Sequence, residues 1–165
     1  MSRHIDAKAL AALAVAGKRP VRSPDRARLL ASAVRPGWEP WTERVAALWD
    51  VSPAQVRAEF GRAGSPREWE PSPVPRVDAF HLDGGPATAG ADVGLVRIPD
   101  GYGFPLHGHS GTEEYVVLQG VMRFADGHRE YPGDRVRHGD SVTHSYVAEG
   151  DVVVAIVMRG ELTAP

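Results

Sequence analysis

The order of apolar and polar positions divides the chain into a helical first part and a β-rich second part. In residues 1–64, apolar side chains recur three and four positions apart, which is the spacing of one face of an α-helix. Proline and glycine interrupt this spacing and leave room for four short helices. Their apolar positions are Ile5, Ala9, Leu13 and Ala16; Leu29, Leu30, Ala33 and Val34; Trp38, Trp41, Val45 and Leu48; and Val56 and Phe60. Helices this short are unstable alone in water, so their apolar faces must pack on one another, on the rest of the chain or on another protein.

The second part follows a connector at 65–76, in which four prolines favour extended chain over a helix or a central strand. Beyond it, short segments rich in Val, Ile, Tyr and Phe are separated by glycine and Asp-Gly turns. The clearest expected strands are 93–98, 114–118, 121–124, 134–137, 144–147 and 152–158. Strands joined by short turns are typical of a sandwich or barrel. We therefore predict a four-helix region at 1–64, the connector at 65–76 and a mainly β barrel at 77–165.

Composition and charge exclude several classes of function. The chain has 165 residues, 42% hydrophobic and 24% charged, and no apolar run approaches the ~20 residues that cross a bilayer. Its first residues lack the pattern of a secretory signal, so we expect a cytoplasmic protein that does not enter a membrane. Residues 1–70 carry 12 basic and 8 acidic side chains, a net charge of +4 that is too small to predict direct nucleic-acid binding. There is no cysteine, so any metal must be bound through nitrogen and oxygen.

Three histidines and a glutamate form the strongest candidate for chemistry. His107 and His109 are two positions apart, so on a strand both imidazoles project from the same face. Glu113 follows a short turn and can enter the same space from the neighbouring segment, and His144 comes after two further turns. Three imidazoles and a carboxylate suit one first-row divalent ion, and these ligands do not choose among Zn, Fe, Mn and Ni.

The segment 101–120 resembles the first sequence motif of the cupin superfamily, G-x5-H-x-H-x3/4-E-x6-G, at every spacing. The second cupin motif, G-x5-P-x-G-x2-H-x3-N, matches less fully. Its glycine and histidine are present, and three other positions differ. The matching residues are Gly133 and His144, and the differing ones are Gly139, Ser141 and Ala148. The resemblance implies a jelly-roll β-barrel with His107, His109, Glu113 and His144 as the metal ligands.

Several other side chains compete for a role at this site. Glu114 also fits the first motif, but the interval to Gly120 favours Glu113, and a shift of one residue would turn the carboxylate to the opposite face of the strand. His138 lies near the second motif and is a candidate for a hydrogen-bonding role behind the ligands. We expect His128, His81 and His4 to be surface residues. Tyr102 and Tyr146 flank the ligands in sequence, and either pocket lining or packing fits them.

The segments 80–87 and 91–101, together with the His-x-His-Ser-Gly-Thr-Glu-Glu run, resemble the cupin domain of ChrR-type anti-sigma factors. In that family a four-helix N-terminal domain holds a sigma factor and the cupin responds to oxidative stress. The resemblance therefore implies a sigma factor or another protein as a partner of residues 1–70. The family's N-terminal zinc element, H-x3-C-x2-C, is absent, so the helices need another source of stability, such as a cluster of Trp38, Trp41 and Trp49. These tryptophans fit either a core or a binding surface.

Three classes of function remain open at this point. The first is a regulatory or sensing module with a helical partner-binding region. The second is a cupin metalloenzyme, such as an iron dioxygenase that acts on a small oxygenated molecule, and the third is simple small-molecule binding. All three use a metal with an open coordination position, and the fold does not decide among them. Cupins commonly pair, so the resemblance also implies a homodimer.

Overall fold

The structure is a computed structural model that describes residues 36–163. Its helical part contains the 3-10 helix η1 (Pro36–Trp41) and the helices α3 (Thr42–Trp49) and α4 (Pro53–Arg62). Helix α4 begins with a capping box, in which Ser52, just before Pro53, and Gln55 exchange hydrogen bonds. The two helices expected before residue 36 lie outside the described residues.

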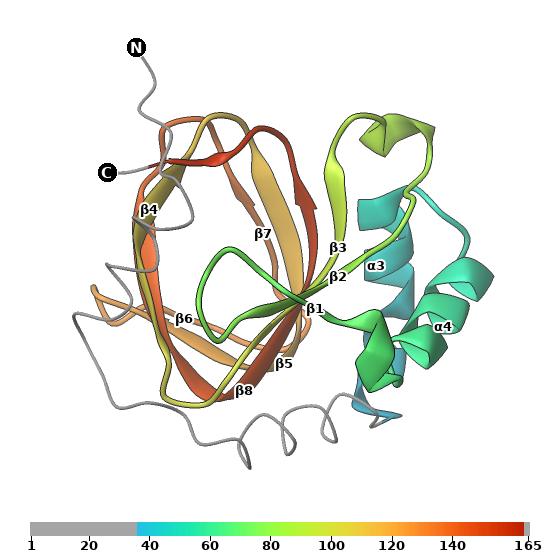
Figure 1. Cartoon of the computed structure of the whole chain (residues 1–165), viewed down its shortest axis with the longest axis horizontal. Coiled ribbons are helices and arrows are strands. Elements are labelled where there is room, and N and C mark those ends of the chain that lie inside the picture. The colour runs from blue at the N-terminus through green and yellow to red at the C-terminus, as the bar shows by residue number, and fades with distance from the viewer. Residues whose placement is uncertain (1–35, 164–165) are drawn as a thin grey trace.

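The rest of the described chain is mainly β, as predicted. Two further 3-10 helices are η2 (Pro66–Glu68), between α4 and the first strand, and η3 (Pro86–Thr88), between the second and third strands. The strands are β1 (Glu70–Pro71), β2 (Asp78–His81), β3 (Asp92–Ile98), β4 (Gly103–His109), β5 (Glu113–Phe124), β6 (Arg129–Glu130), β7 (Arg135–His138), β8 (His144–Met158) and β9 (Leu162–Thr163). The long β8 pairs antiparallel with β3, β4 and β5, so the sheet curls around an interior space (Figure 1).

Two expected breaks in the sheet are wrong. The segments 114–118 and 121–124 belong to one strand, β5, and the segments 144–147 and 152–158 belong to β8. Gly120 and Gly150 have φ angles of 72° and 77°, and the β5–β8 register shifts around Gly120. Glycine adopts this left-handed conformation at little cost, so the chain forms an irregularity and bends without leaving the sheet.

The curled sheet has a different apolar core on each face. Successive β5 side chains point to opposite sides: Val116 and Leu118 face the helices, whereas Tyr115 and Val117 face the interior of the barrel. Figure 1 shows α3 and α4 lying on the outer side of the sheet. The sheet therefore separates a helical layer from the barrel interior.

The tryptophans of the helical part lie in the outer core. Trp38 is 3% exposed and Trp49 is fully buried, and both make edge contacts with Phe60 of α4. Trp41 is half-buried against the same cluster. The core interpretation is thus confirmed for Trp38 and Trp49, but this core is shared with the sheet and does not belong to the helices alone.

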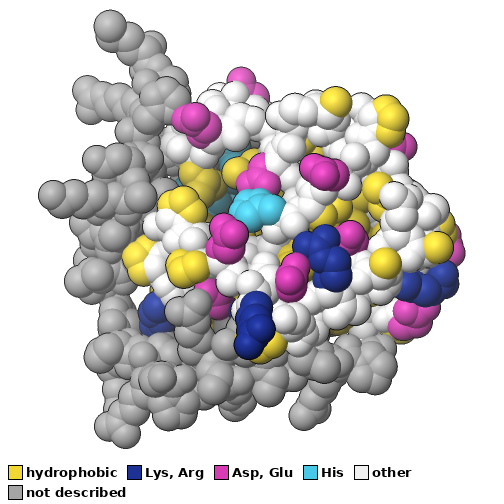
Figure 2. Space-filling model, turned by 45° about the vertical axis from the view of Figure 1, so that its right-hand side comes forward, with side chains coloured by type: hydrophobic (Ala, Val, Ile, Leu, Met, Phe, Trp, Pro, Cys, Tyr) yellow, Lys and Arg dark blue, Asp and Glu magenta, His cyan; other side chains and the backbone are white. Residues whose placement is uncertain are grey.

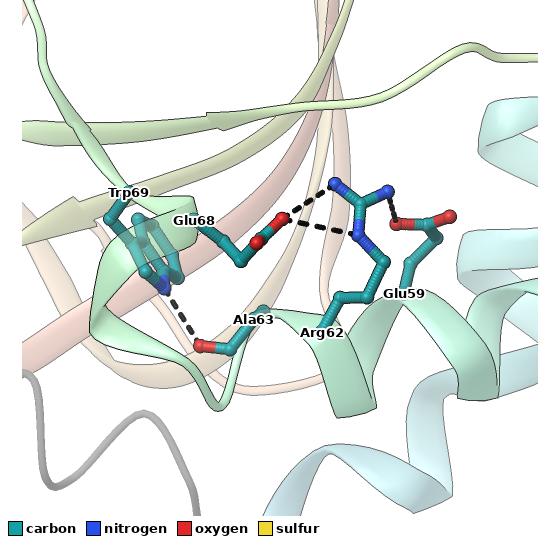
Figure 3. Close-up of polar contacts among 5 residues, drawn as sticks. All are labelled: Glu59, Arg62, Ala63, Glu68 and Trp69. Carbon is teal, nitrogen blue, oxygen red and sulfur yellow. Dashed lines mark hydrogen bonds and ion pairs between the residues drawn. The ribbon is translucent and has the colours of Figure 1, made fainter.

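The proline-rich connector is packed against the fold. It includes η2 and the edge strand β1, and its Trp69 is buried and donates a hydrogen bond from Nε1 to the carbonyl of Ala63 at 2.7 Å (Figure 3). Arg62 bridges Glu59 and Glu68 beside this contact. The buried Arg97 lies 3.9 Å from the centroid of a Trp69 ring and 3.2 Å from a carboxylate oxygen of Asp78. The connector therefore joins the end of α4 to β2 and β3.

Among the described residues, no helix is both long and apolar enough to span a membrane.

Candidate metal centre

The three predicted histidines meet inside the barrel. His107 and His109 lie on β4, and His144 begins β8, where it pairs directly with His107 across the two strands. The Nε2 atoms of His109 and His144 are 3.1 Å apart. One ring nitrogen from each of the three histidines lies within 4.8 Å of those of the other two. All three side chains are buried, so the alternation of strand side chains placed both β4 histidines on the inner face.

Glu113 joins this cluster from the first position of β5. Its Oε2 atom lies 3.3 Å from Nε2 of His109 and 3.5 Å from Nε2 of His144. The side chain is buried, and Oε2 makes no hydrogen bond with any of the described residues. Glu113 therefore lies against His109 and His144, and the four residues predicted from the sequence form one buried cluster.

Burial controls the protonation of the cluster. Together with the neighbouring imidazoles, it lowers the pKa of His109 to about 4 and that of His144 to about 2. The pKa of His107 is also lowered by burial, and its Nδ1 atom donates a hydrogen bond to the carbonyl of Pro105 at 2.8 Å, which leaves the lone pair on Nε2. Neutral imidazoles with available lone pairs are the form of histidine that binds metal ions.

Burial also favours the neutral form of the Glu113 carboxyl group, but for an acid this raises the pKa. Burial, assisted by the charge of Glu130, raises the pKa of Glu113 from 4.5 to about 8, because an ionised carboxylate in this apolar surrounding is poorly solvated. A divalent cation would favour the ionised form. Oε2 of Glu113 is buried without a hydrogen bond, and the cluster also contains the ring nitrogens of three neutral histidines. These atoms thus suit a cation better than a neutral ligand.

The competing carboxylate and the other histidines lie elsewhere. Glu114 points to the other face of β5, where it is half-buried and paired with Arg135. His81 and His128 are exposed, with His81 paired to Asp92 at 2.8 Å, as expected of surface residues. His4 lies outside the described residues. His138 lies beside the cluster.

A buried polar group next to the cluster was not found from the sequence. The hydroxyl of Tyr115 donates a hydrogen bond to Oε2 of Glu130 at 2.7 Å, and its oxygen lies 3.2 Å from Nε2 of His138. Tyr115 follows Glu113 by two positions and so shares its face of β5, which is the one sequence signal that connects it to the site. Glu130 comes from β6 and carried no such signal.

A cavity of about 400 Å³ reaches the cluster. His107, Glu113 and His144 lie in its wall, and most of the remaining lining is apolar. Tyr146 is part of that lining, stacked on Phe104 with ring centroids 5.1 Å apart, whereas Tyr102 is buried outside it. The exposed lining residues at the opening are Pro71, Pro73, His81, Asp92, Gly160 and Glu161. The surface in Figure 2 shows acidic side chains with apolar ones visible between them.

Comparison with known proteins identifies the family. Residues 60–163 match the family model described as the ChrR Cupin-like domain. The chain belongs to this family. Its match covers the whole cavity and all four clustered residues, so the expected cupin jelly-roll fold is confirmed. No protein with a curated description matches the chain.

Two solved structures are similar to this ChrR-like chain. The complex of SigE with the anti-sigma ChrR from Rhodobacter sphaeroides is similar over 88% of this chain and 72% of that chain, with 25% identity and a TM-score of 0.56. That share of the chain exceeds the span of the family model, so the similarity extends beyond the barrel. An acetylacetone dioxygenase from Acinetobacter johnsonii is similar over 59% of this chain and 72% of its own, with 19% identity and a TM-score of 0.50, which shows a common fold.

Proposed function

We propose that this ChrR-like protein is a sensing or regulatory module that binds one divalent metal ion through His107, His109, Glu113 and His144. A small oxygenated molecule enters the barrel and binds beside the ion, and the helical region contacts a protein partner. One observation carries the proposal: His107, Glu113 and His144, side chains of the kind that bind metal ions, lie in the wall of a mostly apolar cavity of about 400 Å³. Cavities of this kind, with few convergent polar groups, are the usual sites of small molecules.

The surrounding residues support both the metal-binding cluster and the small-molecule cavity beside it. The carbonyl of Pro105 holds the His107 ring with its lone pair toward the cluster. The stacked rings of Phe104 and Tyr146 give the neighbouring wall an aromatic surface. When bound, the ion supplies a Lewis acid for an oxygen atom of the small molecule. The apolar wall then favours a compact carbon skeleton over a charged one.

The position of the sheet supports the regulatory role. Glu113 and Tyr115 face the cavity from β5, and Val116 and Leu118 of the same strand pack under the helices. A movement of β5 on ligand binding would therefore change the packing of α3 without any intermediate layer. The similarity to an anti-sigma factor at 25% identity favours a sigma factor or another protein as the partner of residues 1–70.

The tryptophan core limits where that partner binds. Trp38 and Trp49 are buried against the sheet and are not accessible. The exposed side chains of α3 and α4 are polar or alanine, and Arg57 of α4 forms an ion pair with Glu39 of η1. We place the partner contact on these polar faces or on residues before 36.

The alternative is a cupin metalloenzyme that uses the same cavity, with the metal ion activating dioxygen or substrate. The cavity beside the metal-binding side chains suits this role equally well. Oxygen consumption with Fe²⁺ and a diketone such as acetylacetone would separate the two functions. Turnover favours the enzyme, whereas binding without oxygen uptake favours the sensor.

Metal content tests the proposal directly. Full-length protein prepared without a histidine tag or added metal should contain about one equivalent of a divalent ion by elemental analysis. His144→Ala should lose the ion, and His128→Ala should retain it because that side chain is exposed and outside the cluster. Equal occupancy in the two variants would remove His144 from the site. A pull-down with the full chain should recover a sigma factor or another defined protein, and recovery of none would refute the partner.

A further inference from the structure

His138 lies next to the proposed ligands although it occupies an unspecified position of the second cupin motif. It ends β7 and pairs directly with Glu113 across the two strands. Its ring centroid is 4.3 Å from that of His144. A ring nitrogen of His138, one of His144 and a carboxylate oxygen of Glu113 lie within 4.8 Å of one another. His144 therefore belongs to both groups of potential donors, and Glu113 and His138 belong to the second.

The contacts of His138 define where its lone pair lies. The Tyr115 hydroxyl has one hydrogen, which it donates to Glu130 at 2.7 Å. In the 3.2 Å contact between the Tyr115 oxygen and Nε2 of His138, the donor must then be the imidazole N–H. When His138 is neutral, its lone pair is consequently on Nδ1, which takes no part in the contact with Tyr115.

The same contacts match the usual support of a metal-binding histidine. Such a histidine donates its second N–H to a carboxylate, a carbonyl or water, which fixes the ring and strengthens it as a ligand. His138 donates to Tyr115, which is itself bonded to Glu130. In contrast, Nδ1 of His109 and Nδ1 of His144 have no hydrogen-bond partner among the described residues. The ring of His138 is thus oriented by a hydrogen bond that the rings of His109 and His144 lack.

We propose that His138 is a fifth protein ligand of the metal ion, on the side of Glu113 and His144. This inference rests on the proposed metal site and extends it. Five protein donors would leave one position of a six-coordinate ion for a small molecule. They would therefore favour ions that accept six ligands over zinc, which prefers four.

Cobalt(II) binding tests this assignment because its visible absorption reports the coordination number as well as the affinity. The full chain and the variants His138→Ala, His144→Ala and His128→Ala are each stripped of metal and titrated with Co²⁺. His138→Ala should bind at least about tenfold more weakly. Its visible absorption should become more intense, because fewer ligands give stronger cobalt bands. His128→Ala should match the unchanged chain in both measurements.

The outcomes separate this inference from the proposed site. If His138→Ala keeps the original affinity and spectrum while His144→Ala loses binding, His138 is not a ligand and the four-residue site stands. If the unchanged chain binds no Co²⁺, or His144→Ala binds equally well, the proposed site itself fails. A weaker affinity with an unchanged spectrum would make His138 a positioning residue and overturn its assignment as a ligand.

A second variant keeps the test valid if His138→Ala does not fold. Tyr115→Phe preserves the ring but removes the oxygen that accepts the His138 hydrogen bond. We expect it to weaken Co²⁺ binding severalfold and to alter the spectrum, because the His138 ring loses its orientation. Binding and spectrum identical to those of the unchanged chain would overturn the inference.

Discussion

Replacing Glu113 by glutamine should change how the stability of the metal-free protein depends on pH. Burial raises the pKa of the Glu113 carboxyl from 4.5 to about 8, so at neutral pH the folded metal-free chain holds a proton there that the unfolded chain has lost. Glutamine has nearly the same shape but does not titrate. A comparison of the two proteins therefore isolates this one proton.

The sign follows from proton linkage. Between the unfolded and folded pKa values of an acid whose folded pKa is raised, the folded state binds more protons, so stability falls as pH rises. One proton changes the free energy of unfolding by about 1.4 kcal/mol per pH unit. From about pH 6.5 to about pH 7.5, Glu113→Gln should therefore gain about 1.4 kcal/mol relative to the unchanged chain. The buried histidines titrate in both proteins, so their contribution cancels in the difference.

Urea denaturation in the presence of a chelator measures this difference. Both proteins are unfolded at the two pH values, and only the change in their separation is interpreted, because the amide itself shifts the absolute stability. Parallel stability curves over this range would show that Glu113 is not a buried titrating group. If Glu113→Gln instead lost stability relative to the unchanged chain as pH rises, the sign of the argument would be wrong.

Three further predictions concern the metal and the shared core. A divalent ion at a concentration of 100 times its Kd should raise the free energy of unfolding by about 2.7 kcal/mol; thermal denaturation should show this gain in His128→Ala and not in His144→Ala. Trp49 is fully buried between helices and sheet, so Trp49→Ala should cost about 3–5 kcal/mol. Helix and barrel signals should still unfold together in urea; two separate transitions would contradict a shared core. Asp78→Asn removes the carboxylate paired with the buried Arg97 and should cost about 3 kcal/mol by the same assay, whereas a loss near zero would show that the pair contributes little.

The sequence predicted the parts of the site that depend on local geometry. The two-residue spacing of His107 and His109 requires a common face on any strand, and the interval to Gly120 distinguishes Glu113 from Glu114. The structure brings His107, His109, Glu113 and His144 together. Their role as metal ligands stays a prediction. The spacing of turns also predicted a mainly β second part, which is confirmed.

Other features depend on contacts between distant segments, which no local pattern encodes. The sequence predicted separate strands on either side of Gly120 and Gly150. Each glycine instead lies within a longer strand, because the pairing of β5 with β8 continues past both glycines. Trp69 read as part of an extended connector and is instead buried near Arg97. Its burial depends on where β3 passes, not on the prolines around it.

The chain by itself thus determined which nearby residues share a face of a regular strand, because side-chain alternation is a property of the backbone. Only the tertiary structure decided which strands meet. The pairing of β5 with β7 places His138 opposite Glu113, and the helices cover the reverse face of β5. Such neighbours are chosen by the packing of the whole sheet, where burial of apolar area outweighs local preference.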